Sequence, residues 1–110
     1  MNLGRIFSRK KTARRRTPLG SAALVRSARD HAVRARANGD FEGALSLLND
    51  VIRYARDPKD VIAGYVAKAD ILAEDLNMVG KAVAHLDKAL MYRPDDVAIQ
   101  LRREALLLRR

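Results

Sequence analysis

The sequence lacks cysteine and tryptophan and holds only two histidines among its 110 residues. Without cysteine the chain cannot form disulfides, thiolate zinc sites or thiol nucleophiles. His31 and His85 cannot complete a structural zinc shell by themselves, and neither a His-Glu-x-x-His pattern nor a glycine-rich phosphate loop occurs. We therefore expect a protein that is not an enzyme and has no catalytic residues, no metal site and no cofactor. Both histidines are expected on the flanks of helices.

Long apolar runs are also absent. No segment approaches the ~20 apolar residues that a membrane-spanning helix needs. The basic start of the chain is not followed by the apolar segment of a secretory signal, because Arg26 interrupts the short run Ala22–Val25. Position 2 is Asn2, whereas myristoylation requires glycine. Together with the absence of cysteine, these features predict a cytoplasmic protein.

Acidic residues are missing from the first 29 positions, which hold nine of the 22 Lys and Arg residues. The other 13 basic residues are matched by all 13 acidic ones, so the start of the chain carries the whole formal charge of +9. Residues 1–20 show no sustained apolar period, which predicts a flexible, disordered basic tail before a helical domain at residues 21–110. The basic residues of this tail are Arg5, Arg9, Lys10, Lys11, Arg14, Arg15 and Arg16.

Several partners suit such a tail. Charge alone would attract nucleic acid or an anionic membrane, although Phe7 is the only aromatic residue there that could stack on a base. An Arg-rich start without acidic residues also resembles an organelle transit peptide, and a solubilising arm is a further interpretation. The sequence does not separate these alternatives.

Apolar residues spaced three and four apart predict an all-α fold of five helices, at residues 21–38, 40–55, 58–76, 79–92 and from about 96 to the chain end. Strand patterns are absent. Gly39 and Asn77 are expected in left-handed conformations after helices. The expected N-caps are Ser21, Asp40, Asp57 and Asp95, and the expected apolar stripe of the first helix is Leu24, Ala28, Ala32 and Ala35.

The second and fourth helices resemble each other. The segment Gly39–Leu45 aligns with Asn77–Val83 at an offset of 38 residues, and Leu48 then aligns with Leu86. A period of this size is typical of stacked helical hairpins.

These residues resemble the tetratricopeptide repeat (TPR) family, which places a small turn residue, an aromatic, an alanine, a large apolar residue, a small residue and a proline in order. The second half matches with Asn77, Val79, Ala82, Leu86, Ala89 and Pro94, and the first with Gly39, Phe41, Ala44, Leu48 and Val51. Pro58 falls two residues late, and the family period of about 34 residues implies an insertion near residues 54–60. The first helices depart from the family's Trp, Gly and Tyr, with Ala28, Ala32, Ala35, Val66, Asp70 and Ala73 at those positions.

The resemblance implies a degenerate two-repeat member of the family. The implied architecture is an antiparallel helix-hairpin stack of two pairs with a C-terminal capping helix. An unrelated antiparallel helical bundle is the alternative.

In this family the first helices line a concave groove that binds a protein segment. The resemblance places in it Arg26, Arg29, Val33, Arg36, Lys68, Ile71, Glu74, Asp75 and Arg102. Some members hold a C-terminal carboxylate there, but Val33 and Ala98 replace two of the residues required, so that clamp is not expected. The implied function is a non-catalytic scaffold or adaptor with a partly basic groove that favours an acidic peptide. Nucleic-acid or anionic-membrane binding through the tail is the alternative function.

Three consecutive leucines, Leu106, Leu107 and Leu108, lie near the end of the fifth helix. They cover too much of the helix circumference to face one neighbour, so at least one is expected to be exposed. We predict that this helix packs against a partner or against a second copy of the chain as a homo-oligomer. Alternatively, the leucines fold back onto the second helix pair and the last turn frays.

Overall fold

The computed structural model describes the backbone of residues 18–109 and the side chains of residues 22–109. The predicted basic tail, from Arg5 to Arg16, lies outside the described residues. The elements are α1 (Pro18–Ala37), α2 (Phe41–Tyr54), α3 (Pro58–Asp70), the π-helical turn η2 (Ile71–Asp75), α4 (Val79–Tyr92) and α5 (Val97–Arg109). No strand occurs within residues 18–109, which confirms the predicted all-α fold.

The helix boundaries follow local sequence signals, with two corrections. α1 begins at Pro18, three residues before its predicted start, so Ser21 lies inside the helix and is not its cap. Proline suits the first position of a helix because its missing N–H has no partner there. The fifth helix is capped by Asp96, not by Asp95, because the Asp96 Oδ1 accepts a hydrogen bond from the N–H of Ile99 at 3.1 Å.

The other predicted turns and caps are confirmed. Gly39 and Asn77 have φ angles of 84° and 54°, the left-handed conformation that ends a helix. The Asp40 Oδ1 accepts from the N–H of Gly43 at 2.9 Å. The Asp57 Oδ1 accepts from the N–H of Lys59 at the same distance of 2.9 Å. Each carboxylate satisfies an N–H that the first helical turn leaves without a partner.

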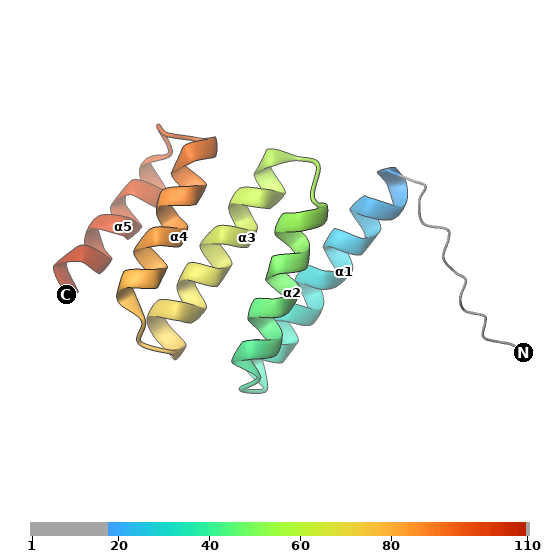
Figure 1. Cartoon of the computed structure of the whole chain (residues 1–110), viewed down its shortest axis with the longest axis horizontal. Helices are drawn as coiled ribbons and strands as arrows, with labels where there is room; N and C mark the ends of the chain where they lie inside the picture. Colours follow the sequence, from blue (N-terminus) through green and yellow to red (C-terminus); the bar gives the residue numbers. More distant parts are fainter. Residues whose placement is uncertain (1–17, 110) are drawn as a thin grey trace, which may run out of the picture.

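Consecutive helices pack antiparallel, α1 against α2 and α3 against α4, and α2 packs on α3 and α4 on α5 (Figure 1). The result is the predicted stack of two helix hairpins followed by a single helix. The fold is elongated, with extents of 57 × 30 × 17 Å. Each hairpin therefore contacts only its neighbours along the stack, as in helical repeat proteins.

The core consists of two clusters of small and aliphatic side chains. One joins α1 and α2 around Ala44, Leu48 and Val51. The other joins α3, α4 and α5 around Leu86. In α1 the buried large residue is Val25, whereas Leu24 from the predicted stripe is 50% exposed.

The turn η2 connects these clusters and was not predicted, since the sequence favoured one continuous helix through Leu76. The N–H of Leu76 bonds to the carbonyl of Ile71, five residues earlier, at 3.1 Å. Ile71 packs in the α1–α2 cluster, while Leu72 packs in the α3–α5 cluster. π-Helical turns insert a residue and shift the side chains that follow, and they are frequent at functional sites.

Candidate functional site

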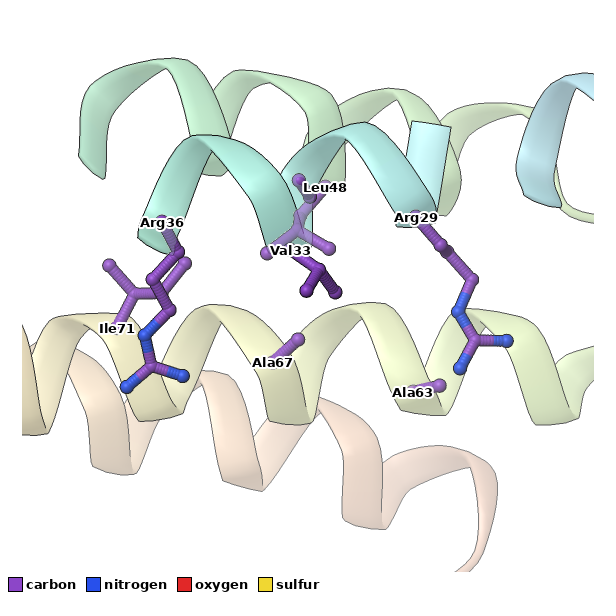
Figure 2. A pocket seen from close by; sticks show the side chains of 8 residues that line it. Arg29, Val33, Arg36, Leu48, Ala63, Ala67 and Ile71 are labelled. Carbon is purple, nitrogen blue, oxygen red and sulfur yellow. The ribbon is translucent and has the colours of Figure 1, made fainter. Parts of the chain in front are cut away.

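A hollow of about 140 Å³ lies between α1 and α3, on the side where the resemblance places the groove (Figure 2). Its walls are built from side chains of α1, α3 and η2, and Leu48 of α2 lies between them. The lining residues are Arg29, Ala32, Val33, Arg36, Leu48, Ala63, Ala67 and Ile71. Four of these, Arg29, Val33, Arg36 and Ile71, belong to the groove expected from the sequence.

Small side chains create the hollow. Ala63 and Ala67 are four residues apart on α3, so they lie on one face of the helix and face α1 (Figure 2). Neither fills the space to the opposite helix. Val33 projects from α1 toward this space, yet it is 70% exposed. The centre of the groove is therefore apolar and accessible.

Ion pairs cross the groove at both ends. The Arg29 Nη1 lies 3.3 Å from the Asp60 Oδ1, and the Arg36 Nε lies 2.5 Å from the Asp75 Oδ2. Figure 2 shows the two guanidinium groups at opposite ends of the hollow, with Val33 between them. These side chains are all partly exposed, so the pairs orient the arginines more than they stabilise the fold.

A second set of ion pairs joins α3 and η2 to α5. Arg102 pairs with Asp70, and the Arg109 Nη1 lies 2.9 Å from the Glu74 Oε2. Glu74 and Asp75 are adjacent, so they point in different directions around their helix and reach α5 and α1 respectively.

Most of the positive charge of the groove is therefore paired, although Arg26 makes no ion pair within residues 22–109. Arg29, Arg36, Arg102 and Arg109 are matched one for one by Asp60, Asp75, Asp70 and Glu74. Asp60, Asp70 and Arg109 were not among the residues expected to line the groove. No local signal marks these pairs, because their members lie 31 to 39 residues apart.

Lys68 does not line the groove, contrary to the expectation. Its Nζ donates to the Asn49 Oδ1 of α2 at 2.6 Å, and it lies near Lys88 and His85 of α4. Lys68 directly follows Ala67, so its side chain points about 100° away from the groove-lining alanine. Arg26 is exposed on α1, one turn before Arg29 and on the same face.

Comparisons of the chain with protein-family models, curated proteins and solved structures gave no match. The resemblance to the TPR family thus remains a prediction based on sequence motifs. Within residues 18–109 no helix is both long and apolar enough to cross a bilayer. The same part of the chain holds no group of three His, Asp or Glu side chains placed to bind a metal ion.

The leucines near the end of α5 lie in different environments. Leu106 is buried in the α3–α5 cluster and Leu107 packs against it, which removes Leu106 from the interface expected from the sequence. Leu108 is 87% exposed, so the expectation of at least one exposed leucine is confirmed. Val97 and Leu101 are exposed on the same face of α5, at 62% and 64%. These three residues form an apolar stripe.

Proposed function

We propose that the protein is a non-catalytic adaptor whose α1–α3 groove binds a segment of another protein. The observation that carries this proposal is the exposed Val33 beside an apolar hollow, between the guanidinium groups of Arg29 and Arg36. Apolar anchors inserted into small pockets supply much of the affinity at protein interfaces. The groove offers such a pocket.

The size of the hollow favours one side chain over a metabolite. At about 140 Å³ it is smaller than the roughly 300–1,000 Å³ of a typical small-molecule site. An aliphatic side chain of a bound segment would contact Val33, Ala67 and Ile71 together. This burial would remove apolar surface from water, which is the main driving force for association.

The arginines favour an acidic residue near that anchor. A guanidinium has five N–H donors, and Arg29 and Arg36 each use one nitrogen, on Asp60 of α3 and on Asp75 of η2 respectively. The other donors can bind a carboxylate of the segment. Because each arginine is already paired, we expect the apolar contact to dominate the affinity and the acidic contact to set orientation.

Selection of peptides from a random library on the intact protein tests this proposal. Selected peptides are then titrated against wild type, Val33→Glu and the control Met91→Glu, which places the same charge on an exposed apolar residue of α4. We expect Val33→Glu to weaken binding at least tenfold and Met91→Glu to leave it within twofold. Peptides that bind Val33→Glu as tightly as wild type would refute the groove as the site.

Deletion of residues 1–16 separates this function from the alternative predicted for the tail. Peptide affinity that persists without the tail supports the groove. If the deletion abolishes peptide binding, and moderate salt abolishes it equally in wild type, the charge on the tail is the cause of binding.

A further inference from the structure

A cluster of basic side chains lies away from the groove, among α2, α3 and α4. Lys81, His85 and Lys88 follow each other at spacings of four and three residues, so they form one stripe along α4. Lys68 follows Tyr65 by three residues on α3, and the Tyr65 ring lies 6.1 Å from the His85 ring, so Lys68 lies on the face of α3 that meets the stripe. We call Lys68, Lys81, His85 and Lys88 the basic stripe.

The members of the stripe act on one another electrostatically. Burial lowers the pKa of Lys68, and the charge of Lys88 lowers it further. Burial is also the largest cause that lowers the pKa of His85, and the charges of Lys68, Lys88 and Lys81 add to it. A hydrogen bond to the carbonyl of Lys81 acts in the opposite direction. The cations are therefore close enough to disfavour each other's charged forms.

Carboxylates do not compensate these charges. Within the described residues, ion pairs are made by six arginines, namely Arg29, Arg36, Arg53, Arg102, Arg103 and Arg109. Lys68, Lys81 and Lys88 make none there, and Lys68 has only the neutral amide oxygen of Asn49 at 2.6 Å. An uncompensated group of like charges raises the local concentration of anions.

Aromatic rings border the stripe. The Tyr65 ring lies 6.1 Å from the His85 ring and 6.4 Å from the Tyr92 ring, measured between centroids. Tyr92 continues the stripe four residues after Lys88 and is 52% exposed. The His85 Nδ1 lies 2.8 Å from the carbonyl oxygen of Lys81, which can only accept, so Nδ1 carries a hydrogen and Nε2 is the nitrogen that titrates.

We propose that the basic stripe binds the phosphate backbone of a single-stranded nucleic acid, with Tyr92 available to stack on a base. Proteins that bind single strands without sequence preference combine a positive track with aromatic rings in this way. Lys81 and Lys88 are seven positions apart, about 10 Å along the helix, so their ammonium groups can contact neighbouring phosphates of one extended strand.

The shape of the stripe favours a linear polyanion over a membrane. Its cations lie in one row along α4, with Lys68 beside it, and do not form a broad plane. Lysine suits this role because its ammonium group is a point charge that binds phosphate without the fixed geometry of a guanidinium. This site is separate from the α1–α3 groove, so either proposal can fail without the other.

Salt dependence of oligonucleotide binding tests the proposal on the full chain. For single strands, the slope of log K against log salt is about −0.7 per phosphate contact. We expect Lys81→Ala/Lys88→Ala to make the slope shallower by about 1.4, corresponding to two lost contacts. Arg56→Ala/Lys59→Ala removes the same charge from exposed positions outside the stripe and should leave the slope within about 0.3 of wild type. The proposal would be overturned if all three proteins had the same slope, or if both variants made the slope shallower by the same amount.

Proton NMR of the imidazole rings provides a local readout, because the chain has only His31 and His85. A bound phosphate favours the imidazolium form, so saturating oligonucleotide should raise the pKa of His85, while the ring resonances of His31 serve as the internal control. Inorganic phosphate and phosphatidylserine vesicles are compared at the same concentration of phosphate groups. The proposal fails if either of them shifts His85 as much as the oligonucleotide does. It also fails if the oligonucleotide shifts neither ring.

Discussion

Leu86 is completely buried at the centre of the α3–α5 cluster, and its replacement by alanine tests the packing of the whole second half. Leu86→Ala removes aliphatic carbons from a site bordered by alanines of the same cluster, Ala69, Ala73, Ala82 and Ala89. Alanine has no side-chain rotamers with which to fill the space. The cavity should therefore persist in the variant.

A persistent cavity places the expected loss high in the usual range. Leu→Ala substitutions in cores cost ~2–5 kcal/mol, and the cost grows with the volume that stays empty. We expect Leu86→Ala to lower the free energy of unfolding by ~3–5 kcal/mol. Leu48 is 4% exposed and lines the groove, so its cavity would open to water, and we expect only ~2–3 kcal/mol for Leu48→Ala.

Urea denaturation followed by circular dichroism measures these losses, with Leu108→Ala as the control. Leu108 is 87% exposed, so the same chemical change should cost less than ~0.5 kcal/mol. Thermal midpoints should fall by about 4–8 °C for each kcal/mol lost, as for other domains of this size. The assignment of the buried faces would be wrong if Leu86→Ala cost no more than Leu108→Ala.

Three further outcomes are expected. Gly64→Ala should lower the free energy of unfolding by ~1–3 kcal/mol, because the added Cβ would lie 2.8 Å from a side-chain carbon of α2. Gly80 has open space around it, so Gly80→Ala should leave that free energy unchanged or raise it by up to ~1 kcal/mol. The pKa of His85 is lowered in the folded protein, so the unfolded chain binds the proton more readily and the stability of wild type should fall as pH drops below about 6.5. Urea titrations at several pH values should show a smaller fall for His85→Gln. We also expect weak self-association through the stripe of Val97, Leu101 and Leu108. Sedimentation should detect a dimer in wild type that Leu108→Glu disrupts, and a wild type that stays monomeric at high concentration would contradict this.

Much of the fold could be predicted because its signals are local. The carboxylates of Asp40 and Asp57 each find an N–H within three residues, and Gly39 and Asn77 end helices through their own backbone conformation. Asp95 was wrongly predicted as a cap, because its neighbour Asp96 accepts the hydrogen bond from Ile99. Either aspartate could serve as a cap, and the docking of α5 through Ile99 decides between them.

The groove was predicted less completely, because a shift of one residue turns a side chain by about 100°. Val33 and Ile71 line the hollow as expected, while Lys68 points toward α2. Ala63, one turn before Ala67 on the same face, could have been found from the same helical period. The carboxylate Asp60 could not, because its partner Arg29 lies on a different helix.

The sequence by itself determined the five helices, their order, most of their ends and the buried positions of Leu48 and Leu86. These depend on propensity, capping and the spacing of apolar residues, which act over a few turns of chain. Tertiary structure alone decided which carboxylates pair with the arginines of the groove and the gathering of Lys68 with Lys81 and Lys88. Side chains up to 39 residues apart meet only when the helices stack, so their charges combine in space and not along the sequence.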